Sequence, residues 1–251
     1  MSDSLGAMCD EFYVSSRLFL KLPLPTGRET VLNFLDRMRK EYPTLRKLRR
    51  REDGGILLEE DNPEGESRRW IRLEEACLRF GHFAPKSPSE FRPLADLVLE
   101  HAPYFLTFSD LDFDHMEVVY GFDLEFRGNH DQLVAETLMN NHPLASFLLG
   151  DEARHVIDMQ PYAGIALTPA CDIQAYIELK SRTTSYEVRT GDYDTHPLTV
   201  FLTVRKYWGF AETENLVDVH RTLLDHADEL ATDRVVPLVV NPLAHAISSR
   251  S

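Results

Sequence analysis

Apolar positions recur along the first half of the chain with two spacings, which predict strands and helices in alternation. Every second position tends to be apolar in residues 12–22, as in a half-buried strand. Residues 27–42 have apolar positions three and four apart, and Pro43 ends this helical pattern. Turn-forming residues at 61–66 separate two further apolar runs, which predicts a hairpin. The expected order is β-α-β-β-α, with strands at 12–22, 54–60 and 68–83 and helices at 27–42 and from about Ser89 to Phe105.

The second half begins in the same way. Residues 115–127 alternate apolar side chains with polar ones such as Asp123 and Glu125, which predicts a strand with one polar face. Asn129 and Gln132 have the spacing of a capping box, so a helix is expected from about residue 130. Further strands are expected at 154–167, 172–189 and 197–208, a helix at 213–231 and a last helical segment at 234–248.

The two halves share more than an order of elements. Val14 and Leu18 of the first expected strand align with Val118 and Phe122 of the corresponding strand in the second half. With a larger offset, Leu99-Glu100-His101-Ala102 aligns with Leu224-Asp225-His226-Ala227. Self-similarity over about half a chain is typical of duplication. We therefore predict two related β-α-β-β-α units, residues 1–110 and 111–251, the second with an extra strand and a C-terminal helical segment.

This arrangement predicts the fold class. Each expected helix has one apolar stripe, so the helices should pack on one face of an antiparallel sheet. Two such units resemble a tandem of ferredoxin-like plaits, which either share one long sheet or pack sheet on sheet. We expect an α+β protein of this kind. The resemblance is one of architecture and implies no particular function.

Composition and charge narrow the functional classes. The chain has 251 residues, of which 43% are hydrophobic, and a formal net charge of −14. Such a charge disfavours a nucleic-acid binder that works through its whole surface, because phosphates would be repelled. Residues 37–51 depart from this average with eight basic side chains and one acid. We interpret them as a solvated helix end and loop; the alternative is contact with nucleic acid, an acidic partner or an acidic surface on another copy.

The start of the chain and the cysteines bear on its location. The first residues show no basic segment followed by an apolar stretch, as a secretory signal would require. No apolar run approaches the roughly 20 residues of a membrane-spanning helix. The three cysteines, Cys9, Cys77 and Cys171, are far apart and form no CxxC pair, which suits a reducing compartment. We expect a cytoplasmic protein with no membrane contact.

Motifs of known chemistry are incomplete in this sequence. Gly128-Asn129-His130-Asp131 resembles a signature block of the calcineurin-like metallophosphoesterases, but the companion blocks that complete a two-metal centre are missing. We interpret this block as a turn and a helix cap. Asp110, Asp112 and Asp114 have the spacing of an EF-hand loop, yet the required Gly and Glu are absent. We therefore predict no catalytic residue, no metal ligand and no cofactor.

The best candidate surface lies in the second half. Alternation in residues 172–180 and 197–208 places Tyr176, Glu178, Arg205 and Tyr207 on polar strand faces. If the apolar faces meet the helices, these four side chains form a polar, aromatic platform. Such a platform suits a small polar ligand or a partner's strand. The alternative interpretation is a solvated sheet face with a cross-strand Glu–Arg pair.

These observations favour a non-catalytic binding or protein-interaction module. We expect a protein partner or self-association, and the platform also suits a small polar ligand; nucleic acid is not an expected partner. One alternative is an enzyme or cofactor-binding protein with a haem or a metal at His226, between the two halves. The second alternative is binding of nucleic acid or an acidic partner through residues 37–51.

Overall fold

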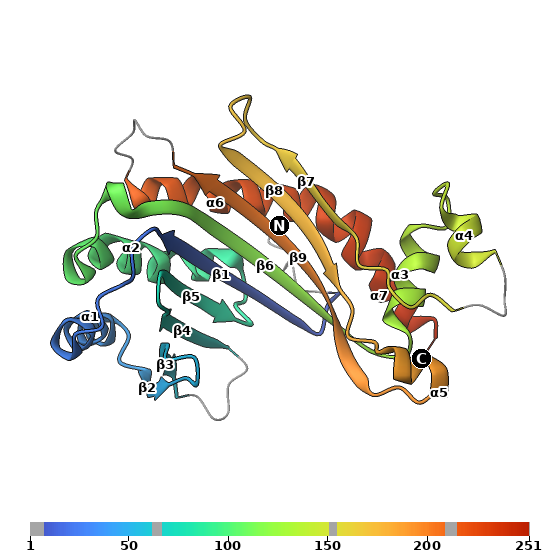
Figure 1. Ribbon diagram of the computed structural model, residues 1–251, viewed down its shortest axis with the longest axis horizontal. Helices are drawn as coiled ribbons and strands as arrows, with labels where there is room; N and C mark the ends of the chain where they lie inside the picture. The colour runs from blue at the N-terminus through green and yellow to red at the C-terminus, as the bar shows by residue number, and fades with distance from the viewer. Residues whose placement is uncertain (1–7, 62–66, 151–154, 209–214, 251) are drawn as a thin grey trace.

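The computed structural model describes residues 8–61, 67–150, 155–208 and 215–250. Within these residues, nine strands form one antiparallel sheet (Figure 1). The α+β class and the antiparallel sheet are thereby confirmed. The strands are β1 (Glu11–Leu20), β2 (Leu45–Arg50), β3 (Ile56–Glu60), β4 (Arg68–Leu73), β5 (Cys77–Phe83), β6 (Phe113–Arg127), β7 (Tyr162–Ala166), β8 (Ile173–Lys180) and β9 (Thr195–Tyr207).

Helices connect these strands and extend the C-terminal part of the chain. They are α1 (Arg28–Glu41), α2 (Arg92–Leu106), α3 (His130–Leu138), α4 (Ala145–Leu149), α5 (Ser185–Thr190), α6 (Leu216–Leu230), a π-helical segment (Ala231–Val240) and α7 (Asn241–Ser248). Short 3-10 turns occupy Pro88–Glu90 and Asp110–Asp112. No helix in the described ranges is both long and apolar enough to cross a lipid bilayer.

The sheet joins both halves of the chain at its centre. Its order is β2-β3-β4-β5-β1-β6-β9-β8-β7, and β1 pairs directly with β6. In each half the chain runs from the central strand to an outer edge, β2 or β7, and returns strand by strand toward the centre. Two ferredoxin-like units are not shown; a single sheet runs through all the described strands.

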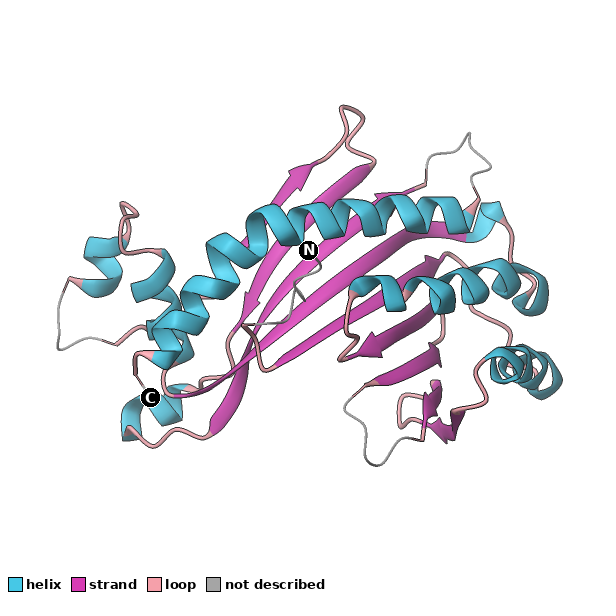
Figure 2. Ribbon diagram, turned by 180° about the vertical axis from the view of Figure 1, so that it is seen from behind, coloured by secondary structure: helices cyan, strands magenta, loops and turns pink. Residues whose placement is uncertain are grey.

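The helices define two different faces of the sheet. The long rod made by α6, the π-helical segment and α7 crosses the sheet on the same side as α1 and α2 (Figure 2). The face toward them carries large apolar side chains with almost no exposure, among them Phe80, Tyr120 and Phe122. Burying one such side chain contributes about 1.5–3 kcal/mol. No described helix covers the opposite face, seen from the front in Figure 1, and we call it the open face.

Two polar contacts lie inside the layer between sheet and helices. Ser16 Oγ is 2.7 Å from His220 Nε2, and both side chains are fully buried. Tyr120 donates a hydrogen bond of 2.5 Å to Asp228 of α6, which Arg92 also contacts at 3.3 Å. Buried polar groups of this kind need partners, because an unpaired one costs about 1–3 kcal/mol. Both contacts therefore tie α6 to the central strands.

Several element boundaries differ from the sequence-based expectations. The expected strand at 68–83 is broken by a turn between β4 and β5, where Glu74 N donates to Cys77 O. The expected strand at 172–189 ends at Lys180, and α5 follows, begun by a capping box of Thr184 and Glu187. The expected strand at 154–167 is reduced to β7. Residues 62–66, 154 and 213–214 of the expected elements lie outside the described residues.

The largest correction concerns the basic segment 37–51. It was expected to be a helix end and loop, but residues 45–50 form β2, an edge strand paired with β3. In the described residues the first half thus holds five strands and the second four, so the extra strand lies in the first half. The sequence pattern conceals β2 because only Leu45 is buried among its side chains. An edge strand with charged side chains resists pairing with another chain.

Candidate binding surface on the open face

Cross-strand register brings three charged residues into a row on the open face. Arg205 of β9 lies opposite Glu117 of β6, and Glu117 lies opposite Arg17 of β1. Directly opposed residues in antiparallel strands project to the same face, so these side chains meet. Gln174 of β8 lies opposite Arg205 and extends the row.

Glu117 is the centre of this row. Its carboxylate is 3% exposed and accepts a hydrogen bond of 2.7 Å from Arg205 Nε and one of 3.4 Å from Arg17. His115 Nε2 lies 3.7 Å from the same carboxylate. One negative charge is therefore shared by two guanidinium groups, and the group of three keeps one net positive charge.

Aromatic rings surround Arg205. Its guanidinium carbon lies 5.2 Å from the centre of the Tyr176 ring and 5.5 Å from that of Tyr207, within the range of cation–π attraction. Arg205 also donates a hydrogen bond of 2.6 Å to the Tyr207 hydroxyl. Tyr162 of β7 stacks on Tyr176 with 5.6 Å between ring centres. Arg205 is thus held in one orientation by an acid and a set of rings.

The four predicted platform residues are placed as follows. Tyr176, Arg205 and Tyr207 contact one another on the open face. Glu178 lies on the same face but pairs with Lys180 at 3.5 Å and opposes Phe201 rather than Arg205. The carboxylate that holds Arg205 comes instead from Glu117. The only signal for Glu117 in the sequence is its place on the polar face of residues 115–127. That signal does not reveal that β6 lies next to β9.

The motif of one acid between two arginines occurs twice more on the open face. Glu59 of β3, which is 6% exposed, lies 3.0 Å from Arg49 and 3.8 Å from Arg68. Glu74 lies 3.0 Å from both Arg72 and Arg79. We call the three groups the Arg–Glu–Arg bridges. Sequence reasoning missed them because each bridge draws its members from different strands.

Two aromatic rings lie flat against the sheet between these charges. A Cβ atom on Gly81 would lie 2.7–2.9 Å from three atoms of the Trp70 indole, and one on Gly164 would lie 2.6 Å from the Tyr176 ring. Only glycine leaves room for such a close approach. Each ring therefore lies against bare backbone, and Arg205 and Tyr162 also contact the Tyr176 ring. Arg79 lies 5.9 Å from the centre of the Trp70 ring.

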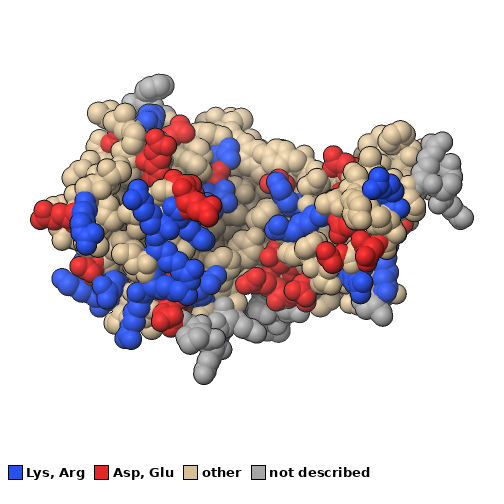
Figure 3. Space-filling view, turned by 60° about the horizontal axis from the view of Figure 1, so that its bottom comes forward, with Lys and Arg blue, Asp and Glu red and all other residues tan. Residues whose placement is uncertain are grey.

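Charged side chains are unevenly distributed over the surface. Lys and Arg side chains gather at the end of the molecule that carries α1 and β2–β4 (Figure 3). Arg72 there also pairs with Asp53, so one more acid offsets part of this charge. Arg17 Nε and Arg79 Nε are buried and have no hydrogen-bond partner in the described part of the chain. The open face thus carries guanidinium groups whose Nε atoms are buried against the sheet.

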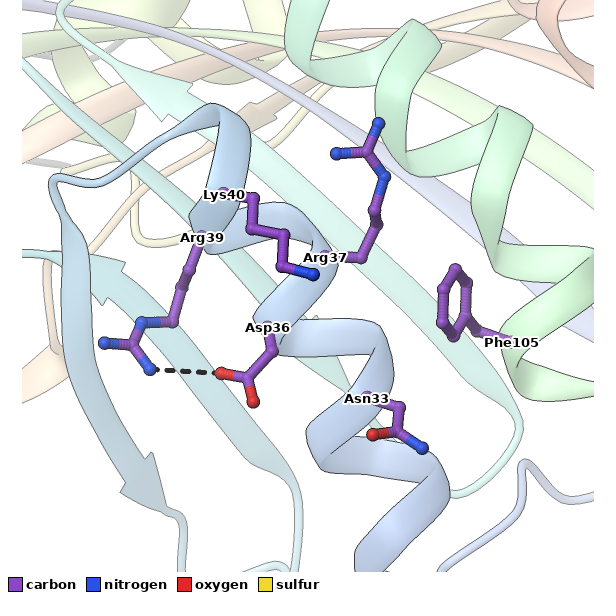
Figure 4. Close-up of a pocket in the computed structure, with 6 residues that line it drawn as sticks. All are labelled: Asn33, Asp36, Arg37, Arg39, Lys40 and Phe105. Carbon is purple, nitrogen blue, oxygen red and sulfur yellow. Dashed lines mark hydrogen bonds and ion pairs between the residues drawn. The ribbon is translucent and has the colours of Figure 1, made fainter.

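The basic segment also contributes to a hollow on the helix side. This hollow, of about 470 Å³, lies between α1 and α2 and is lined by Asn33, Asp36, Arg37, Arg39, Lys40 and Phe105. Arg39 turns onto Asp36 at 3.1 Å, whereas Arg37 and Lys40 extend toward α2 (Figure 4). Arg37 also contacts Glu41 at 2.7 Å. Residues 37–51 are thus divided between the end of α1 and the edge strand β2.

The two histidines that align between the halves of the chain, His101 and His226, make separate contacts. His101 accepts a hydrogen bond of 3.1 Å from Arg37, and His226 is half-buried on α6. Among the described residues, no group of three or more His, Cys, Asp or Glu side chains has the arrangement of a metal site.

The Gly-Asn-His-Asp block has a structural role, as predicted. Asn129 caps α3 by accepting a hydrogen bond from Gln132 N. Asp131 is buried and accepts from Met159 N at 2.7 Å and from Ser181 Oγ at 2.8 Å. These side chains hold the 155–161 and 181–184 segments against α3.

Comparison with known proteins does not assign the chain to a family. No known family model matches the chain, and a search of curated proteins found none that matches it in sequence.

Proposed function

We propose that this protein is a non-catalytic binding module whose open face receives an anionic ligand or partner. The single observation that carries the proposal is the set of Arg–Glu–Arg bridges on the face that no described helix covers. Each bridge has two guanidinium groups and one carboxylate; the Glu117 and Glu59 bridges keep a positive charge, whereas Asp53 offsets that of the Glu74 bridge. Guanidinium groups fixed in this way bind carboxylates and phosphates well, because little side-chain entropy is lost on binding.

Binding is favoured over catalysis by the state of the acids on this face. A general base must be free to accept a proton from its substrate. Glu117 and Glu59 are each buried and held by two arginines, so neither carboxylate is free to approach a substrate. The platform of Tyr176, Arg205 and Tyr207 then acts as a rigid site of recognition, with Glu178 and Lys180 at its side.

Arg205→Gln is expected to weaken binding of an anionic probe about tenfold, or ~1.4 kcal/mol, because one charge-assisted contact is lost. Two labelled probes are suitable, an oligoglutamate peptide and an inorganic polyphosphate, measured by fluorescence anisotropy at low salt. Arg39→Gln is the matched control, since it removes the same charge from α1, away from the open face. Equal weakening by both variants, or no binding of either probe to the native protein, would contradict the proposal.

We also propose that residues 1–110 and 111–251 derive from duplication of one α+β unit. The support is topological: each half starts with a central strand, continues through a helix to an outer edge and returns to the centre. The pseudo-symmetric pair β1–β6 then places Arg17 and Glu117 of the Arg17–Glu117–Arg205 bridge on either side of the junction. Duplication thus accounts for a binding face shared by both halves.

A further inference from the structure

We infer that the ligand of the open face is a single-stranded nucleic acid, whose phosphates contact the Arg–Glu–Arg bridges and whose bases stack on the flat rings. This inference rests on the proposed function and names its ligand class. The net charge of the whole chain is −14, which argues against a nucleic-acid binder that uses its whole surface. It does not argue against binding at one face. Tertiary structure brings six arginines and three glutamates together on one face, so the bridges carry a local positive charge that Asp53 beside Arg72 reduces.

The positive charge forms a path across the strands. The bridges draw their arginines from β2, β4, β5, β1 and β9, which span six neighbouring strand pairs in the sheet. At about 4.8 Å between strands, the path is roughly 29 Å long. Known single-strand sites on β-sheet domains accept about 4–16 nucleotides. An extended oligonucleotide laid across the strands would meet the bridges one after another.

Aromatic rings distinguish a nucleic acid from other anions. Trp70 of β4 and Tyr176 of β8 lie close against glycines, and an arginine lies over each ring, with its guanidinium carbon 5.9 Å and 5.2 Å from the ring centre. Flat rings on an open sheet face are the surfaces on which unpaired bases stack. An acidic polypeptide would use the arginines but would have no reason to need the rings. A duplex keeps its bases inside and would also leave the rings unused.

Neighbouring side chains enlarge the stacking surface. Tyr207 is 36% exposed and Tyr162 is 63% exposed, and both contact the Arg205–Tyr176 group. Phe19 and His115 stack on each other with 4.1 Å between ring centres, beside Glu117. The aromatic side chains thus alternate with the bridges along the path. In contrast, the basic segment 37–51 has Tyr42 as its only aromatic residue.

The test compares probes that share phosphates but differ in bases. Fluorescence anisotropy would measure binding of a labelled 16-nucleotide single-stranded RNA, the same sequence as a duplex, and polyphosphate of equal charge. We expect the single strand to bind most tightly, with an affinity that falls steeply between 50 and 200 mM salt. Trp70→Ala should weaken RNA binding at least fivefold and leave polyphosphate binding unchanged, because only the bases stack.

Tyr176→Ala provides a second variant near the other edge of the sheet, where a loss of folding is less of a concern. Tyr104→Ala, which removes an 82% exposed ring from α2, is the matched control and should leave both affinities unchanged. Circular dichroism would verify that each variant is folded. If RNA binds no more tightly than polyphosphate and neither ring variant lowers RNA binding selectively, the inference fails and the general anion-binding proposal survives. If Arg205→Gln affects no probe, both fail.

Discussion

Replacing Glu117 by leucine is expected to lower the free energy of unfolding by about 2–3 kcal/mol. The carboxylate is 3% exposed and is the shared partner of Arg17 and Arg205. Removing it leaves two guanidinium groups close together without a counter-charge. Breaking a fully buried ion pair costs about 3–5 kcal/mol. The arginine side chains here are 32% and 25% exposed, so water reduces the effect.

The measurement is urea denaturation of the native protein and the variant at pH 7. Glu125→Leu is the matched control, because Glu125 lies on the same strand and face but is exposed. That variant should change stability by less than about 0.5 kcal/mol. Adding Arg205→Met to Glu117→Leu should restore part of the loss, since it removes one of the unpaired charges. Equal losses from Glu117→Leu and Glu125→Leu would show that the bridge does not stabilise the sheet.

Acidification is expected to destabilise the protein through His220. Burial lowers the pKa of this imidazole from 6.5 to about 3, because the charged ring would lie among apolar groups such as Phe80 and Phe91. His220 Nδ1 also has no hydrogen-bond partner in the described residues. Between pH 6.5 and 3 the unfolded chain binds a proton that the folded chain does not. Stability is therefore complete above about pH 6.5 and falls by ~1.4 kcal/mol per pH unit below it.

A double variant isolates this effect. Ser16→Ala with His220→Leu removes both partners of the buried contact, so neither is left unpaired. Between pH 6.5 and 5, its free energy of unfolding should fall by about 2 kcal/mol less than that of the native protein. His155→Gln, at an exposed position, is the control and should keep the native pH dependence. Identical pH profiles for the double variant and the native protein would contradict the role of His220.

His82 adds to the same acid sensitivity. Its side chain is buried and within 2.7 Å of Ser67 Oγ, and burial lowers its pKa to about 4. The unfolded chain again binds a proton first, so stability is lost as the pH falls from about 6.5 toward 4. As the pH falls, the native protein should therefore lose stability more steeply than protonation of His220 alone would cause. Residual acid sensitivity in the His220 double variant is expected from this source.

Local pattern was sufficient for most elements. The alternation in residues 12–22 corresponds to β1, and the spacing in residues 27–42 corresponds to α1. Asn129 caps the start of α3 as the spacing predicted, although the Gln132 side chain bonds Val156 and Glu136 rather than completing a capping box. Each of these signals is carried by residues close together in the chain, and the apolar side chains face the core because water excludes them.

The candidate site was only partly accessible to the same reasoning. Tyr176, Arg205 and Tyr207 share a face because side chains alternate along a strand, and that much is local. The partner of Arg205 depends on which strand lies next to β9. No pattern within β6 or β9 indicates that these two strands are neighbours. Glu178 is two residues from Tyr176 and was the nearer candidate, yet Glu117 occupies the position opposite Arg205.

By itself the sequence determined the alternation of helices and strands, the antiparallel α+β class and which side of each element is apolar. These properties follow from spacing and turn chemistry within a few residues. Tertiary structure alone decided the strand order, the edge position of β2, the burial of His220 and the three Arg–Glu–Arg bridges. Each of these joins residues far apart in the chain, and their meeting depends on how the elements pack, which local periodicity does not encode. A chain of net charge −14 thereby gathers six arginines on one face.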